Sequence, residues 1–110
     1  MANFLFWNIR GVGNDASLAR LKRIVKKHSI GMVAILEPMI EPANLPRIIL
    51  SLGFGGGSAN VSGKIWILWS KSFVILPLFD SSQLLSVVCS SSFFAPPFIF
   101  SAVYAKCDRL

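Results

Sequence analysis

Apolar positions change their period twice within the first third of the chain. Residues 3–9 (NFLFWNI) are rich in aromatic and branched side chains, which is typical of a β-strand. Residues 17–30 (SLARLKRIVKKHSI) place apolar side chains at helical spacing, with Asn14 or Asp15 as the expected cap. Residues 32–38 (MVAILEP) form a continuous apolar run, the pattern of a strand buried on both faces. The order predicts a βαβ-like opening, whose two strands need not be sheet neighbours.

The middle of the chain predicts a second helix followed by a loop. Residues 44–54 (NLPRIILSLGF) have the pattern of a short helix, with Asn44 as its cap and Gly53 at its end. Residues 53–63 (GFGGGSANVSG) are rich in glycine and are predicted to form a flexible loop. The loop does not have the glycine and lysine spacing of a P-loop.

Four apolar runs without helical periodicity follow the predicted loop. They are residues 64–70 (KIWILWS), 73–79 (FVILPLF), 83–90 (QLLSVVCS) and 98–106 (FIFSAVYAK). Short turns and the segment APP are expected to separate these strands, which favours antiparallel neighbours. The whole pattern predicts an α/β fold with a mixed sheet and flanking helices.

Composition changes this picture, because the chain is more apolar than a free-standing soluble domain. Hydrophobic residues make up 54% and charged residues 15%, with a mean hydropathy of +0.63, whereas soluble domains carry about 25% charged residues. This favours a membrane protein or an interior-rich piece of a larger domain. Residues 81–105 carry no formal charge and are long enough to cross a bilayer. Pro96, Pro97, Gln83 and several serines argue against a spanning helix there.

The charge balance of +6 suits a polyanionic partner such as DNA, although many short basic chains have no such role. The candidate nucleic-acid contacts are Arg10, Arg20, Lys22, Arg23, Lys26 and Lys27. Cys89 and Cys107 are too few for a disulfide framework or a zinc site. They favour reduced thiols in an intracellular protein, with the nucleus as one candidate compartment.

Three polar residues stand near the ends of apolar runs and could do chemistry. A carboxylate at Glu37 is costly to bury unless it meets a metal or a cation, and a hard cation such as Mg²⁺ would suit it. Alternatively, Glu37 begins a solvated loop. The Asn8 amide could donate to a phosphate oxygen or orient a carboxylate, or it could cap the next turn. Tyr104, close to Lys106 and Arg109, could face a phosphate or mark the edge of the core.

These residues occur in three ordered segments: WNIRGVGN with Asn8, VAILEP with Glu37 and SAVYAKCDR with Tyr104. Together the segments resemble the endonuclease/exonuclease/phosphatase superfamily, also called DNase I-like. More narrowly, they are similar to the amino-terminal part of the endonuclease of plant non-LTR (LINE-type) retrotransposons. The segments LGF, SGKIWILW and SSQLL fit the same pattern, so the resemblance covers essentially the whole chain.

The resemblance implies a four-layer α/β sandwich that hydrolyses DNA phosphodiesters with Mg²⁺ or Mn²⁺. It implies that Glu37 binds the metal, that Asn8 contacts the phosphate and the active-site network, and that Tyr104 helps to hold the phosphate. In the retroelement, this activity nicks target DNA and leaves a 3′ hydroxyl for reverse transcription. Residues 1–110 would be the amino-terminal portion of such a domain, truncated at its C-terminus and missing its other half.

The sequence departs from the family in its second half. It has neither the Asp-x-Asn motif nor the Asp-His pair, and Asp108 lies too close to Tyr104 to supply the former. Losing residues that act as a unit removes nearly all catalysis, so the chain alone is expected to be inactive. The alternatives are a non-catalytic basic nucleic-acid-binding remnant and a membrane-associated protein built on residues 81–105, although no stable membrane insertion is expected.

Overall fold

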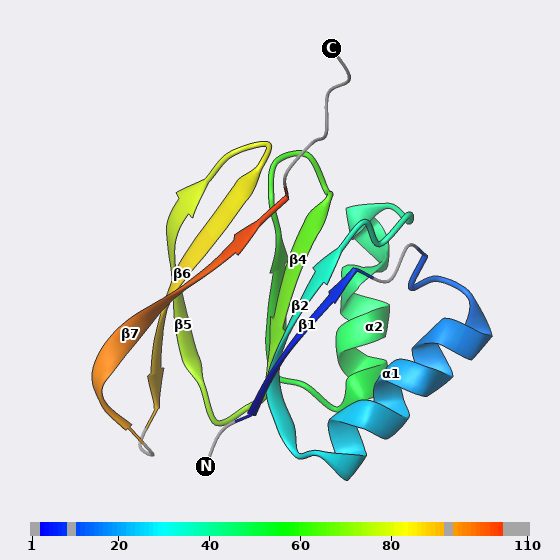
Figure 1. The fold of residues 1–110 in the computed structure, drawn as a ribbon, viewed down its shortest axis with the longest axis horizontal. Coiled ribbons are helices and arrows are strands. Elements are labelled where there is room, and N and C mark those ends of the chain that lie inside the picture. The colour runs from blue at the N-terminus through cyan, green and yellow to red at the C-terminus, as the bar shows by residue number, and fades with distance from the viewer. Residues whose placement is uncertain (1–2, 9–10, 92–93, 105–110) are drawn as a thin grey trace.

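Two helices cover one face of a four-stranded sheet, and a three-stranded sheet packs on the other face (Figure 1). The computed structural model describes residues 3–8, 11–91 and 94–104. The elements are β1 (Asn3–Asn8), α1 (Asp15–Lys27), β2 (Ile30–Leu36), a 3₁₀ turn (Pro42–Asn44), α2 (Leu45–Leu52), β3 (Gly56–Ala59), β4 (Ile65–Trp69), β5 (Val74–Asp80), β6 (Leu84–Ser91) and β7 (Phe94–Val103). The prediction of an α/β fold is therefore confirmed.

The first sheet has the strand order β1-β2-β4-β3. Strands β1 and β2 are parallel neighbours, and Asn8 lies opposite Leu36. The predicted βαβ opening is confirmed, and its strands are in fact adjacent. The Asn14 side chain caps α1 by accepting the Ser17 N–H at 2.8 Å. Strand β2 is buried on both faces, as its continuous apolar run predicts.

The predicted second helix is present, and Gly53 ends it in a left-handed conformation with φ at 69°. Asn44 stands at the N-cap position, but its side chain does not cap α2; its Nδ2 donates to the Glu41 carbonyl at 3.2 Å instead. Asn44 is the last residue of the 3₁₀ turn, with φ at −83° and ψ at −7°, so it lacks the extended backbone of a typical capping residue.

The prediction of a flexible loop over residues 53–63 is wrong in its centre, because β3 lies there and pairs with β4. The glycines permit close packing. A Cβ atom added to Gly56 would lie 2.6 Å from Nε1 of Trp69, so only glycine lets this strand approach the indole ring. The glycine-rich composition therefore reflects a tight contact across the sheet.

The second sheet is antiparallel with the order β5-β6-β7, which confirms the prediction of antiparallel neighbours for residues 73–79, 83–90 and 98–106. The prediction is wrong for residues 64–70, because β4 does not pair with β5 and instead lies between β2 and β3 in the first sheet. The expectation that the APP segment separates two strands is wrong, because Pro96 and Pro97 lie inside β7. Strand β7 is at the edge of its sheet. The register with β6 also shifts there, between the pairs of Cys89 with Phe98 and of Ser91 with Phe94. Prolines are tolerated at such a position, because an edge strand and a bulge both leave backbone N–H groups without a ladder partner.

The core has two parts, one on each face of the first sheet. Buried side chains on β2 and β4 that face the helices include Val33, Ile35, Trp66 and Leu68. Those that face the second sheet include Met32, Ala34, Ile65 and Ile67, which pack with Leu85, Val87, Cys89 and Ala102. Because β2 and β4 are covered on both sides, their sequences are continuously apolar.

The outer face of the second sheet is exposed and apolar. Leu76 on β5 is 58% exposed, and Ile99 on β7 is 62% exposed. Val74 and Val103 lie on the same face and are also exposed. Nothing among the described residues covers these side chains. They account for part of the unusually apolar composition, since they are apolar without being buried. None of the described helices has the length and apolar character needed to cross a membrane.

Cys89 lies on β6 between the two sheets and is fully buried. Burial raises the pKa of its thiol from 9.0 to about 11, because the thiolate would lose its hydration. The unfolded chain releases this proton at lower pH than the folded chain, so the thiol's contribution to stability is present below pH 9 and is lost as pH rises toward 11. Cys107 lies outside the described residues.

We expect ionisation of the Cys89 thiol to lower the free energy of unfolding by about 2 kcal/mol as the pH rises from 8 to 10.5. Denaturant unfolding of the original chain and of Cys89→Ala at both pH values measures the difference. The Cys89→Ala chain should lack this part of the pH dependence, whereas Cys107→Ser should keep it. An equal loss of stability in the original chain and Cys89→Ala would contradict the assignment.

Candidate functional site

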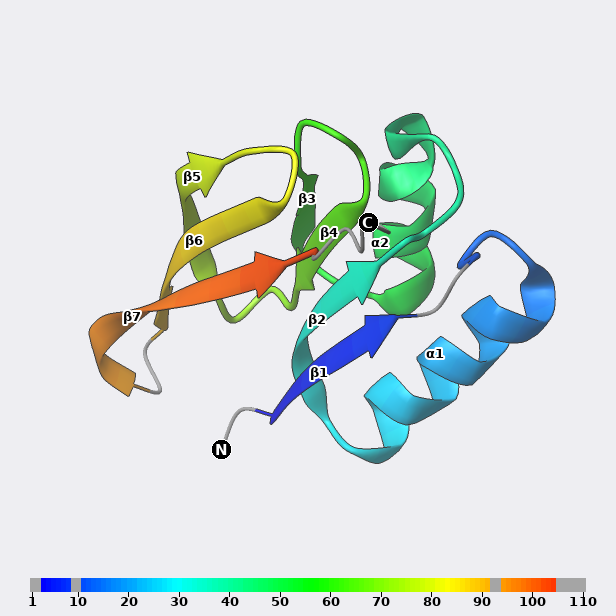
Figure 2. The same ribbon diagram turned by 45° about the horizontal axis from the view of Figure 1, so that its top comes forward.

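The carboxyl ends of β1, β2 and β7 lie at the same end of the molecule (Figures 1 and 2). Asn8 is the last residue of β1, Glu37 directly follows β2, and Tyr104 directly follows β7. The parallel pairing of β1 with β2 places Asn8 beside Leu36, the residue before Glu37. Residues from both sheets therefore meet at this end.

A side-chain hydrogen bond joins the two sheets at this point. The Tyr104 hydroxyl donates to Oε1 of Glu37 at 2.7 Å, although the residues are 67 positions apart. The backbone of Glu37 is held on both sides, since its N–H donates to the Lys64 carbonyl at 2.9 Å and its carbonyl accepts the Gly11 N–H at 3.1 Å. The Tyr104 N–H donates to the Gln83 carbonyl at 2.9 Å. The alternative in which Glu37 touches only solvent is wrong.

The backbone of Glu37 has an unusual conformation, with φ at 54°. A non-glycine residue in this left-handed region costs about 1 kcal/mol or more. Leu36 faces the second sheet, so a regular strand would turn the next side chain toward the helices. The left-handed turn instead allows the Glu37 carboxylate to reach Tyr104 on the face between the sheets.

Asn8 lies on the same face of the first sheet and is exposed. Phe4 and Phe6 precede it at alternate positions of β1, and each ring contacts Phe100 of β7, at centroid distances of 5.7 and 5.8 Å. Since side chains alternate along a strand, Asn8 points toward the second sheet as they do. The structure thus brings Asn8, Glu37 and Tyr104 to one face and one end.

The chemistry of these side chains fits a hard cation only in part. Mg²⁺ is commonly held by one or two carboxylates, several waters and the phosphates of a substrate. Glu37 supplies one carboxylate, whose Oε1 accepts from the Tyr104 hydroxyl. Within the described ranges, no three His, Cys, Asp or Glu side chains gather as a metal-binding group. The site can therefore offer a cation one protein carboxylate, without a dedicated cage.

Two shallow grooves lie beside this pair of residues. One, of about 420 Å³, is lined by Ser62, Lys64, Ser82, Gln83 and Tyr104. The other, of about 240 Å³, is lined by Met39, Ile40, Glu41, Pro42, Ser62, Gly63 and Lys64. Ser62 and Lys64 line both grooves, so the turn between β3 and β4 separates them.

Hydrogen bonds tie this turn to the turn between β5 and β6. Asn60 is 3% exposed, and its Nδ2 donates to the carbonyls of Ser81 at 2.9 Å and Ser82 at 3.2 Å. Its Oδ1 accepts the Ile65 N–H at 3.0 Å. The Ser62 hydroxyl also donates to the Ser82 carbonyl, at 3.0 Å. We refer to Asn60, Ser62, Ser81 and Ser82 as the loop latch.

Sequence reasoning missed the loop latch. The local signal was Asn60, three residues before Gly63 and shortly before the apolar run that begins at Ile65. This arrangement is typical of a turn. That signal could have indicated a hydrogen-bonded turn at Asn60. It could not have identified Ser81 and Ser82, because these partners are 21 and 22 positions away.

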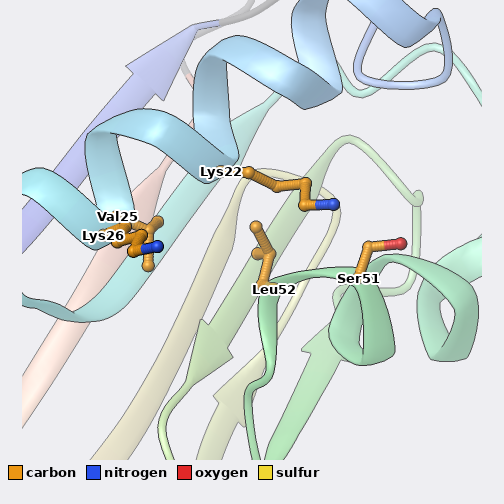
Figure 3. A pocket seen from close by; sticks show the side chains of 5 residues that line it. All are labelled: Lys22, Val25, Lys26, Ser51 and Leu52. Atoms are coloured by element: carbon orange, nitrogen blue, oxygen red, sulfur yellow. The ribbon is translucent and has the colours of Figure 1, made fainter.

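The candidate nucleic-acid contacts occupy another part of the molecule. Exposed basic side chains on α1 are Arg20, Lys22, Arg23, Lys26 and Lys27, and Arg10 lies outside the described residues. Figure 3 shows Lys22 extending from α1 toward α2, where the Ser51 hydroxyl lies. Lys22, Lys26 and Ser51 help to line a groove of about 330 Å³ between the helices. This basic helix covers the face of the first sheet opposite Tyr104, so the structure does not bring it to Glu37.

Comparison of the sequence with protein-family models and with curated proteins finds no match.

Proposed function

We propose that this chain carries the amino-terminal half of a site for metal-dependent DNA phosphodiester hydrolysis, of the DNase I-like type. The observation that carries the proposal is the hydrogen bond from Tyr104 to Glu37, with Asn8 on the same face and at the same end. The resemblance assigns a role to each of these three residues, which come from separate segments of the sequence. A shared site requires that the three side chains lie close together.

The proposed roles follow from the chemistry of the three side chains. Glu37 would hold Mg²⁺ or Mn²⁺, and the ion would supply a Lewis acid for the phosphate. The Tyr104 hydroxyl orients the Glu37 carboxylate by donating to one of its oxygens. The Asn8 amide can donate to a phosphate oxygen that approaches the end of β1. The residues bind and orient the substrate at the ends of three strands.

The proposal also covers the arrangement of the layers. Helices, first sheet and second sheet would be three of the four layers of a DNase I-like sandwich, with the exposed face of β5, β6 and β7 as the place for the fourth. The exposed apolar side chains on that face support this arrangement, since an apolar sheet face is stable when another layer covers it. Nicking of target DNA by a LINE-type retroelement is the setting that the resemblance implies.

We further propose that the chain does not turn over substrate by itself. Hydrolysis needs a base that activates water in addition to a metal. His28, the chain's one histidine, directly follows α1 and is exposed. The described residues also supply no group of three metal ligands. Binding of metal without hydrolysis is therefore the expected behaviour.

This expectation is tested with supercoiled plasmid and by Mn²⁺ binding. The 110-residue chain should produce no nicked plasmid with Mg²⁺. It should bind Mn²⁺ weakly in paramagnetic resonance titrations, and Glu37→Gln should abolish that binding because it removes the carboxylate charge. Glu41→Gln is the matched control, since Glu41 is exposed and lies four positions further on. It should leave Mn²⁺ binding unchanged.

Two results would contradict the proposal. Plasmid nicking that disappears in Glu37→Gln would show that the chain is a complete nuclease. Mn²⁺ binding that Glu37→Gln does not alter would remove the metal site.

The second candidate is a non-catalytic nucleic-acid-binding protein, and the exposed basic face of α1 favours it. DNA binding of this kind weakens steeply as salt is raised, because basic side chains release counterions from the phosphates. Salt-dependent DNA binding without metal binding at Glu37 would favour this candidate over the first.

A further inference from the structure

We propose that the groove of about 420 Å³ beside Tyr104 binds a phosphate group of a polynucleotide strand, with Lys64 as its cationic contact. The choice of a polynucleotide rests on the proposed function, which this inference deepens by naming a second contact next to the Glu37 site. The groove is large enough for a nucleotide-sized group, since small-ligand sites begin at about 300 Å³.

The lining of the groove suits an anion. It consists of one lysine, the Ser62 and Ser82 side chains, the Gln83 amide and the Tyr104 phenol, and it contains no carboxylate. The Lys64 ammonium and the Gln83 amide can donate hydrogen bonds to phosphate oxygens. The Tyr104 and Ser62 hydroxyls shape the groove, since they already donate to Glu37 and to the Ser82 carbonyl. The neighbouring groove on the other side of Lys64 includes Glu41, whose charge disfavours an anion there. The groove on the side of Ser82 and Gln83 has no carboxylate among its lining residues, and the Glu37 carboxylate that is bonded to Tyr104 lies next to that lining. Lys64 therefore supplies the positive charge that a phosphate needs in this groove.

Lys64 is close to the candidate chemistry. Its carbonyl accepts the N–H of Glu37 at 2.9 Å, so the two backbones are directly bonded. The Tyr104 phenol, which donates to Glu37, also lines the same groove. A strand with one phosphate at Lys64 would thus have its neighbouring backbone close to the Glu37 carboxylate.

The walls of the groove are held in place by bonds within the protein. The loop latch joins the turn that carries Lys64 to the turn that carries Gln83. The Gln83 carbonyl also accepts the Tyr104 N–H. A groove that is ordered in this way loses little conformational entropy when a ligand binds.

The test measures binding of a short fluorescent single-stranded DNA to the 110-residue chain in EDTA, so that no metal contributes. Lys64→Ala should weaken binding about fivefold to tenfold and should reduce the slope of affinity against salt by about one counterion. Lys71→Ala is the matched control, because Lys71 is an exposed lysine near the opposite end of β4. It should weaken binding by less than about twofold.

Lys64→Arg should bind DNA nearly as well as the original chain, because arginine also donates to phosphate. Amide chemical shifts upon titration with inorganic phosphate then locate the anion. Shifts at residues 62–64 and 81–83 support the proposal, and their absence on adding chloride shows that phosphate is the ligand. DNA that shifts these amides when phosphate alone does not would also support it, with the strand as the source.

Equal weakening by Lys64→Ala and Lys71→Ala would overturn the inference. Phosphate shifts confined to the α1–α2 groove would overturn it as well. Mn²⁺ binding tests the metal site, and the effect of Lys64→Ala in EDTA tests the groove without metal, so a failed metal site and a failed phosphate groove give different results.

Discussion

Asn60→Ala should lower the free energy of unfolding by about 3 kcal/mol. The side chain is buried and makes hydrogen bonds to the carbonyls of Ser81 and Ser82 and to the N–H of Ile65. Truncation leaves these backbone groups without their partner in a part-buried region, and each buried unpaired group costs about 1–3 kcal/mol. Chemical denaturation followed by tryptophan fluorescence measures the loss.

Asn44→Ala is the matched control for this change. Its Nδ2 makes an exposed hydrogen bond to the Glu41 carbonyl at 3.2 Å, so its loss should cost about 0.5 kcal/mol or less. Asn60→Asp should be nearly as damaging as Asn60→Ala, because it keeps the acceptor for Ile65 but removes the donor to two carbonyls. Equal effects of Asn60→Ala and Asn44→Ala would show that the loop latch contributes little.

Trp66→Ala should lower the free energy of unfolding by about 4 kcal/mol. Trp66 on β4 is fully buried and packs between the first sheet and the helices, with neighbours that include Val33 and Leu68. Removing a buried aromatic side chain loses its transfer free energy and leaves a cavity, and such changes cost about 3–5 kcal/mol. The same denaturation measurement, followed by circular dichroism, tests it.

Trp66→Phe separates packing from hydrogen bonding at this position. The indole Nε1 of Trp66 is buried and has no hydrogen-bond partner in the part of the chain that the structure describes. Phenylalanine restores much of the volume and removes this unpaired donor, so the loss should be about 1–2 kcal/mol. Equal destabilisation by Trp66→Phe and Trp66→Ala would contradict this prediction.

Local patterns predicted the elements whose structure depends on near neighbours in sequence. The βαβ opening followed from the change of period between residues 3–9, 17–30 and 32–38, and Asn14 caps its helix through a residue three positions away. The end of α2 at Gly53 was also predictable, because a left-handed residue after a helix is a local requirement.

Features that depend on distant residues were not predictable in this way. The glycines of β3 indicated flexibility, because the sequence does not reveal that this strand packs against Trp69. The prolines of β7 indicated a break, and the strand continues past them because β7 is an edge strand whose register with β6 shifts between Phe94 and Phe98. The contact of Glu37 with Tyr104 and the left-handed backbone of Glu37 likewise required the tertiary structure.

The order in which the sheets assemble follows from how their strands are connected. Strands β5, β6 and β7 pair with their immediate successors, so this meander closes only short loops and can form early. In the first sheet, β1 pairs with β2 only through a crossover that contains α1. Strand β2 then pairs with β4, although α2 and β3 lie between them in the sequence. The bond between Tyr104 and Glu37 spans 67 positions. The phenol therefore meets the carboxylate only when the two sheets are docked, so this contact reports on the docking of the sheets.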